Sequence, residues 1–284
     1  MKASILRKRV AWLSIAAMLF VACGDEEEAA NPNDNDDKGE KIKEKEKEKE
    51  PKVNTTRREY KPQKDFMQLV VENGVEVVLK QGEPQKIEVE TLEELHEFIQ
   101  FSATGSSLKV ETSPKEKFAD HPAPKVYITT QALEKIEINH NSVLRIEGTW
   151  AQEGLWLSLN ESSQATGEVQ ISKRLDALTS RRSTLTLTGS VREALYIQAD
   201  SSEADVGHAR FGAKLKDLAA IERANVKASN QGYIELWAGK ELSITAVDNQ
   251  SVVKYYGSPQ ITTSLDNVKA GSTLEAMGPH PSQQ

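Results

Sequence analysis

The sequence predicts an all-β protein in the form of a right-handed parallel β-helix, or solenoid, with repeats of ~20 residues. Two observations carry this prediction. Beyond residue 64, Val, Ile and Leu alternate with polar residues in short runs separated by Gly, Asn and Ser, which is the pattern of half-buried strands. A leucine then recurs at a nearly constant interval along most of the remaining chain, which indicates stacked repeats.

Short strands are expected in the first part of this region. The candidates are residues 66–71, 75–79, 87–89 and 108–110, where every second residue is apolar. Only residues 92–98 have the pattern of a helix, and that helix is brief. The folded part is therefore expected to consist almost entirely of strands.

The repeat begins at Leu133. Leading leucines stand at positions 133, 155, 175, 195, 215 and 242, so the interval is close to 20 until the last unit, which is longer. A Ser or Ala follows within each unit, at positions 142, 163, 183, 202, 224 and 251, and we expect it at a corner. A unit this small cannot bury an apolar face alone, whereas stacked units can. A twisted β-sandwich is the alternative, but it does not require the phase to hold over six units.

The N-terminal segment, from Met1 to Ala22, has the pattern of an export signal. Lys2 and the basic run at 7–9 precede an apolar stretch at 10–22 that is too short to span a bilayer comfortably. Ala22 stands before Cys23, the only cysteine in the chain, and this arrangement resembles a bacterial lipobox. We expect cleavage after Ala22 and lipid attachment, such as palmitate, at Cys23. An ordinary signal peptide with a chance cysteine is the alternative.

Residues 23–64 are expected to form a disordered, charged tether, because they offer little to bury. Their acidic start resembles the surface-export signal of Bacteroidetes lipoproteins, whereas a generic spacer facing the periplasm is the alternative. The expected order is a signal peptide (1–22), the tether (23–64), a β-helical domain (65–279) and a disordered tail (280–284). This order predicts an outer-membrane lipoprotein of the bacterial cell envelope that is exposed at the surface.

Composition argues against several functions. The net charge of −7 argues against nucleic-acid binding, and one cysteine cannot form an intramolecular disulfide. The five histidines lack metal-ligand spacing, and the sequence contains no nucleophile elbow, phosphate loop or dinucleotide fingerprint. We therefore expect no cofactor, no metal and no catalytic residue.

Two segments carry a family resemblance. The first is FMQLVVENGVEVVLKQG at residues 66–82, in which an Asn-Gly turn precedes a Gln-Gly turn, and the second is NQSVVKYYGSP at 249–259. They resemble the head GIN domain family of auto-transporter adhesins, best populated in Bacteroidetes, over about residues 66–278. The resemblance implies a β-helical domain on an exported, often lipidated protein, and it brings no known reaction. The chain departs from the family pattern in having Asn and Arg at corner positions, where small residues are usual.

Outward-facing aromatic residues are the expected ligand-binding positions. Trp156 and Tyr196 each alternate with inward aliphatic residues, so they point outward in the same phase, two units apart. Two strand spacings separate them by roughly 10 Å, which suits a platform for sugar rings. Tyr233 and Trp237 are expected to supply a second platform. The alternative is that these rings cover the flank of the solenoid or pack beneath a loop.

These expectations favour non-catalytic, adhesin-like binding at the cell envelope, with a surface or extracellular polysaccharide as the ligand. A polysaccharide lyase or hydrolase is the runner-up, because parallel β-helices include such enzymes. Its charged cluster would comprise Asp176, Arg181, Arg182, Asp200 and Asp205, although outward charges are ordinarily a solvated face. An envelope scaffold that binds a protein partner through an exposed strand edge is a third possibility.

Overall fold

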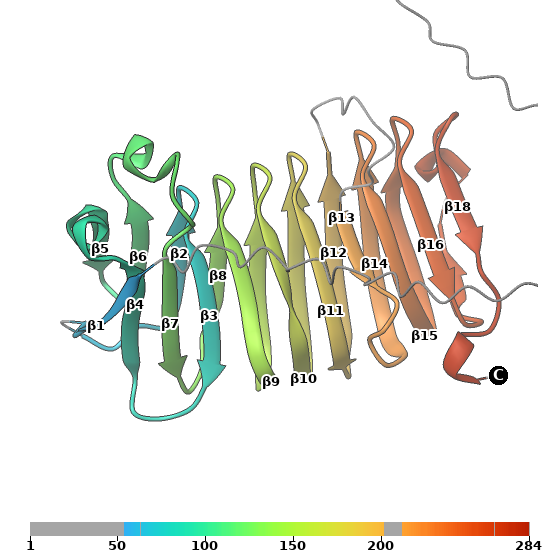
Figure 1. The fold of residues 1–284 in the computed structure, drawn as a ribbon. Helices are drawn as coiled ribbons and strands as arrows, with labels where there is room; N and C mark the ends of the chain where they lie inside the picture. The colour runs from blue at the N-terminus through green and yellow to red at the C-terminus, as the bar shows by residue number, and fades with distance from the viewer. Residues whose placement is uncertain (1–53, 63, 202–211, 264, 284) are drawn as a thin grey trace, which may run out of the picture. The chain divides into compact units, whose positions relative to one another are not determined.

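The computed structural model describes residues 54–62, 64–201, 212–263 and 265–283. The expected signal peptide, Cys23 and most of the expected tether lie outside the described residues, as does Asp205. The described residues form 18 strands and four short 3-10 helices, so the predicted all-β class is confirmed (Figure 1). No helix in these ranges is long and apolar enough to cross a membrane.

The elements follow one another along the chain with few long connections. The strands are β1 (Thr55–Tyr60), β2 (Gln68–Glu72), β3 (Glu76–Gln81), β4 (Lys86–Leu92), β5 (Ile99–Thr104), β6 (Ser107–Thr112), β7 (Lys125–Thr130), β8 (Lys135–Ile138), β9 (Val143–Leu159), β10 (Gln164–Ser180), β11 (Thr184–Val191), β12 (Ala194–Asp200), β13 (Gly212–Leu215), β14 (Ile221–Ser229), β15 (Tyr233–Val247), β16 (Val252–Tyr256), β17 (Gln260–Thr262) and β18 (Thr273–Ala276). The 3-10 helices are η1 (Glu93–Phe98), η2 (Lys115–Phe118), η3 (Leu265–Asn267) and η4 (Pro281–Gln283). The helix expected at 92–98 corresponds to η1.

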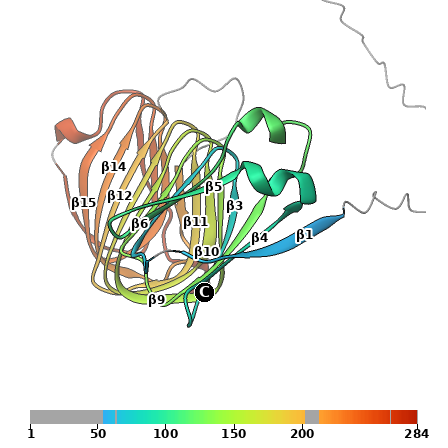
Figure 2. The same cartoon turned by 90° about the vertical axis from the view of Figure 1, so that its left-hand side faces the viewer.

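The strands stack in two parallel ladders. Ladder A consists, in order, of β7, β3, the first part of β9, the first part of β10, β11, β13, the first part of β15, β16 and β18. Ladder B consists of β6, β2, β8, the second part of β9, the second part of β10, β12, β14, the second part of β15 and β17. Because β9, β10 and β15 belong to both ladders, the 18 strands form one continuous sheet around the interior (Figure 2).

The register of ladder B follows the leucine repeat across its central strands. Leu155, Leu175 and Leu195 are direct cross-strand partners, so these leading leucines lie in one row. The next partners in the row are Ala224 and then Leu242. The expected unit led by Leu215 is therefore wrong, because Leu215 belongs to ladder A and pairs with Leu236. The longer connection between β12 and β13 moves the repeat at β14 out of the earlier phase.

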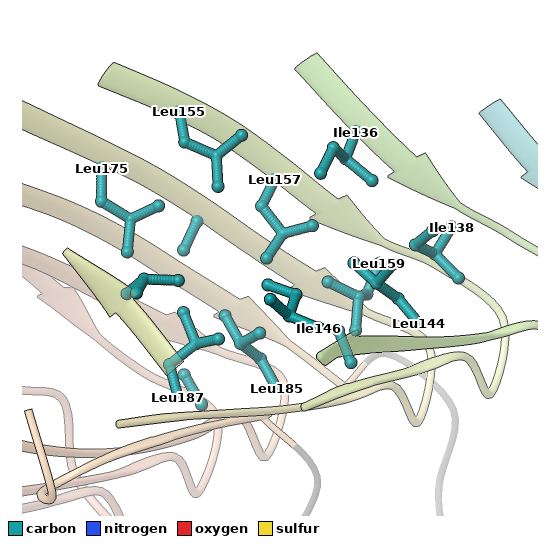
Figure 3. Packing of buried hydrophobic residues seen from close by; sticks show 14 of the residues in the cluster. Ile136, Ile138, Leu144, Ile146, Leu155, Leu157, Leu159, Leu175, Leu185 and Leu187 are labelled. Atoms are coloured by element: carbon teal, nitrogen blue, oxygen red, sulfur yellow. The ribbon is translucent and has the colours of Figure 1, made fainter. Parts of the chain in front are cut away.

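Aliphatic residues from both ladders fill the interior. Figure 3 shows Leu157 and Leu175 of ladder B facing Leu185 and Leu187 of ladder A, and all four are fully buried. Burying each such side chain contributes roughly 1.5–3 kcal/mol of transfer free energy. The fully buried Trp150 adds a large ring to this core. The core thus depends on the inward column that the alternation predicts.

One row of corners connects ladder B strands to the ladder A strands that follow them. Buried serines occupy four of these corners, at Ser142, Ser163, Ser183 and Ser251. The hydroxyl oxygen of Ser183, for example, accepts a hydrogen bond from the Ser163 N–H at 3.2 Å. Arg181 and Arg182, which directly precede Ser183, are exposed and have φ of 47° and 62°. Asn141, Asn230 and Asn249 have the same positive φ at their corners, a conformation that Asn adopts more readily than most residues, while the two arginines are accommodated because their side chains extend into solvent.

The folded region begins before residue 65, the expected domain boundary. Strand β1 pairs antiparallel with β4, which in turn pairs antiparallel with β7. The Tyr60 ring stacks on Phe101 with centroids 3.9 Å apart, and the Arg57 guanidinium lies 3.9 Å from the centre of the Tyr127 ring. Residues 55–60 thus form an edge strand, although their charged composition resembles that of the preceding segment.

The C-terminal residues also differ from the expected disordered tail at 280–284. His280 is buried, and its ring stacks on that of Trp237 in ladder A. Helix η4 follows directly after this contact. Aromatic packing therefore holds the chain to the sheet as far as His280.

Candidate functional site

One outward-facing column crosses ladder B. Its members are direct cross-strand partners on successive strands: Lys135, Trp156, Asp176, Tyr196, Asn225, Ser243 and Thr262. Trp156 and Tyr196 therefore share one phase two strands apart, with Asp176 between them, as their alternation predicts. The register shifts in these strands fall outside the column, so the row is uninterrupted.

Trp156 is half-buried against the strand that precedes it. The Lys135 ammonium nitrogen lies 4.5 Å from the centre of the Trp156 ring, which is a cation–π contact, and Lys135 also pairs with Glu137. One face of the indole is thus occupied by Lys135. The rest of the indole is only partly covered, because Trp156 is half-buried.

A bidentate ion pair lies between the two aromatic rings. Arg174 donates from Nε to Asp176 Oδ2 at 2.8 Å and from Nη2 to Oδ1 at 2.6 Å. These hydrogen bonds and the carboxylate charge raise the pKa of the Arg174 guanidinium above its usual value. The pair presents planar donors and acceptors at the centre of the column.

A hollow of about 300 Å³ begins beside Tyr196. Ala194 lies between Arg174 and Arg223 in the register, and its small side chain leaves space between the two arginines. Arg223 forms no ion pair with any other residue of the described ranges. Further lining residues include Asn225, Glu241, Ser243 and Thr262. We call the column from Trp156 to Thr262, together with this hollow, the ladder B groove.

Arg174, Ala194 and Arg223 are groove residues that the sequence alone does not single out. Each directly precedes the leading residue of its repeat. For Arg174 and Ala194, the sequence signal that could have identified them is therefore their place before the recurring leucines Leu175 and Leu195. Arg223 is hidden because its repeat begins at Ala224 and not at the expected Leu215.

The structure does not bring Tyr233 and Trp237 to the groove. Both belong to ladder A, and Tyr233 is only 8% exposed, with its hydroxyl donating to Glu235 Oε2 at 2.8 Å. The ring of Trp237 is covered by His280. These two positions therefore match the packing alternative better than a second open platform.

The charged cluster considered for catalysis is divided among separate contacts. The partners are Arg174 for Asp176, Glu161 for Arg181 and Asn230 for Asp200. Arg182 lies at an exposed corner. Within the described ranges, no three His, Cys, Asp or Glu side chains are grouped so that they could hold a metal ion.

Residues 65–259 match the model of a family described as "Putative auto-transporter adhesin, head GIN domain". This match covers more than half of the chain. The chain belongs to this family. Membership of the head GIN domain family agrees with the resemblance of segments 66–82 and 249–259, and it places the chain among adhesin-like proteins.

Crystal structures share the fold of this head GIN domain chain. A "putative adhesin" from Bacteroides fragilis gives a TM-score of 0.59 at 14% identity, covering 81% of this chain and 96% of the other. A "putative adhesin" from Parabacteroides merdae gives 0.55 at 15% identity, with coverages of 78% and 96%. A "putative lipid binding protein" from Parabacteroides distasonis gives a TM-score of 0.53 at 13% identity, covering 80% of this chain and 98% of the other. At these identities the likeness establishes the fold alone. No curated protein matches the sequence.

Proposed function

We propose that this chain is a non-catalytic, adhesin-like glycan-binding protein, and that the ladder B groove is its binding site. The observation that carries the proposal is the alignment of Trp156 and Tyr196 on either side of the Arg174–Asp176 pair, with the hollow continuing beyond Tyr196. Aromatic rings pack against the C–H face of a sugar, while a few fixed polar groups bind its hydroxyls.

The charges of the groove suit a neutral, hydroxyl-rich ligand. Asp176 neutralises Arg174, and Glu241 is the cross-strand neighbour of Arg223. Guanidinium and carboxylate groups together supply both donors and acceptors, which every sugar hydroxyl can use. A strongly anionic ligand would gain little net attraction from this balanced set.

The same proposal includes the finer description of the fold as a right-handed parallel β-helix with repeats of ~20 residues. The direct pairing of Leu155, Leu175 and Leu195 supports the repeat length. Connections between parallel strands are right-handed in nearly all proteins, which supports the handedness.

Lipid anchoring at Cys23 places the proposed binding activity at the outer membrane, facing outward. It is supported by the signal-like segment 1–22 and by the charged segment 23–53, which would lift the domain from the membrane. Cys23→Ser should move the protein from the membrane fraction to the soluble fraction. If the unlipidated chain stays with the membrane, the anchor proposal fails. Protease accessibility on intact cells would separate the surface from the periplasmic location.

The test of function is to expose the full chain to a broad glycan panel beside two variants. Trp156→Ala should lose the glycan class that the wild type retains, because it removes a ring of the groove. Trp237→Phe is the matched control, since Trp237 lies in ladder A under His280. Absence of binding by the wild type would overturn the proposal.

The same incubation distinguishes the other functions. A polysaccharide lyase or hydrolase would release shortened chains, and a single carboxylate substitution would abolish that release. A scaffold would retain an envelope protein and be indifferent to glycans. Retention of a glycan without product formation is the result that we expect.

A further inference from the structure

The long dimension of the ladder B groove runs perpendicular to the strands, and its short dimension runs along them. Its hollow takes residues from five strands, β10, β12, β14, β15 and β17, but spans no more than three positions on any one, such as 194–196 on β12. Four strand spacings amount to ~19 Å, whereas three residues span only ~7 Å along a strand. Trp156 on β9 extends the groove to five spacings, or ~24 Å. A ligand that fills it is therefore a linear chain running across the strands.

The two aromatic rings are separated by an even number of strands. Trp156 and Tyr196 lie two spacings apart, roughly 10 Å, with Asp176 on the strand between them. In an extended β-1,4-linked glycan each sugar advances by about one strand spacing, ~5 Å. Successive sugars of such a chain are turned over, so every second sugar presents the same face. Rings two strands apart would then meet equivalent faces of alternate sugars.

We propose that the groove binds an extended, two-fold β-1,4-linked glycan along the long axis of the stack, which rests on the proposed function of the groove. Trp156 and Tyr196 pack against alternate sugars, and the Arg174–Asp176 pair binds the hydroxyls of the sugar between them. Beyond Tyr196, the chain continues over Asn225, Ser243 and Thr262. These polar side chains leave room for it and offer hydrogen bonds.

Glycans of other geometry do not fit this row. A β-1,3-linked chain curves and an α-1,4-linked chain coils. After a few sugars, either chain therefore turns away from the straight row of side chains on ladder B. Such chains would contact one aromatic ring at a time. The groove thus selects for chain conformation more than for the identity of each sugar.

The first test compares oligosaccharides of increasing length by calorimetry with the full chain. Cello-, chito- and manno-oligosaccharides are the β-1,4-linked probes, and laminari- and malto-oligosaccharides are the controls. Affinity for at least one β-1,4-linked series should rise with length and level off at about five or six sugars, the number that ~24 Å accommodates. Equal or tighter binding of a coiled or curved series would overturn the proposal.

The second test moves one aromatic ring along the column. Tyr196→Ala should weaken binding of the β-1,4-linked probe about tenfold or more. Adding Ser243→Tyr to that variant restores a ring at an even spacing from Trp156, so affinity should recover severalfold. Adding Asn225→Tyr instead places the ring at an odd spacing and should give no recovery. Equal recovery in both would overturn the two-fold match.

Controls distinguish a loss of binding from a loss of folding. They also distinguish failure of the β-1,4 inference from failure of the proposed glycan-binding function. Asn225 accepts a hydrogen bond from Thr245 at 2.8 Å, so Asn225→Ala in the Tyr196→Ala background measures the loss of that contact alone. All variants should share the wild-type melting temperature. If a glycan of another linkage binds and Trp156→Ala abolishes its binding, glycan binding stands and the β-1,4 inference fails. If no glycan binds, both fail.

Discussion

The imidazole of His280 lies parallel to the indole of Trp237, with ring centroids 4.2 Å apart and an interplanar angle of 3°. Tyr256 approaches the same imidazole edge-on at 5.3 Å. These contacts attach the C-terminal segment to ladder A. They also explain why Trp237 serves packing, whereas Trp156 has the polar cross-strand neighbours Lys135 and Asp176 and is half-buried.

His280→Ala should expose Trp237 to solvent. The stacked pair is worth about 1 kcal/mol, so we expect a small fall in the free energy of unfolding and stronger quenching of tryptophan fluorescence by acrylamide. The same substitution in a Trp237→Phe background is the control and should leave quenching unchanged. Unaltered quenching in His280→Ala itself would mean that another group covers the indole.

The groove could be predicted in part, and the reason lies in the regularity of the central repeats. Trp156 and Tyr196 share a phase because each central strand of ladder B pairs with the next at the constant interval of the leucine repeat. Alternation alone predicts that Tyr233 and Trp237 also point outward, but it carries no information about the distant segment that covers Trp237. His280 lies far beyond Trp237 in the chain, so its contact depends on tertiary packing.

The ends of the fold were the least predictable from sequence. Residues 55–60 form β1 through ion pairs and aromatic contacts with β4 and β7, not through an alternating apolar face. Such a strand is indistinguishable by composition from a charged linker. In the same way, the phase at Ala224 depends on the length of the preceding connection, which composition does not specify.

Leu157→Asp should unfold the domain. Leu157 is fully buried in the inward column of ladder B, and an unpaired carboxylate there costs several kcal/mol. Leu178 is the matched control, because it lies on the next strand, faces outward beside Ser158 and is only half-buried. Leu178→Asp should leave the circular dichroism melt nearly unchanged. Similar melting of the Leu157→Asp variant and the wild type would contradict the inward assignment.

Gly189→Ala should be strongly destabilising. Gly189 has φ of 101°, and a Cβ at this position would lie 2.1 Å from the carbonyl oxygen of Val169. The backbone strain alone is worth about 1–3 kcal/mol, and the clash adds to it. Gly154 is the control, because its φ is not in the left-handed region and its nearest neighbour to a Cβ is 3.5 Å away. Urea unfolding should show a loss for Gly189→Ala only. Equal stability of both variants would show that ladder A can shift there.

The edge formed by β1 and η1 should loosen in acid because of His96. Its Nε2 lies 2.9 Å from Thr56 Oγ1 and 3.2 Å from the Thr56 carbonyl oxygen. Burial, and secondarily the positive charge of Arg58, lower the pKa of His96 below 6.5 in the folded state. The unfolded chain therefore binds the proton more readily, so this contribution to stability is present above pH 6.5 and is lost as the pH falls below that value.

Amide hydrogen exchange across β1 measures this loosening. The protection of residues 55–60 against exchange should fall as the pH falls through 6.5, so that their exchange slows less than the intrinsic rate does. Glu93, which accepts a hydrogen bond from Thr56 at 2.7 Å, is the facing carboxylate. His96→Gln removes the titrating group, so its β1 exchange should follow the intrinsic rate alone. If wild type and variant show the same pH dependence, His96 does not control this edge.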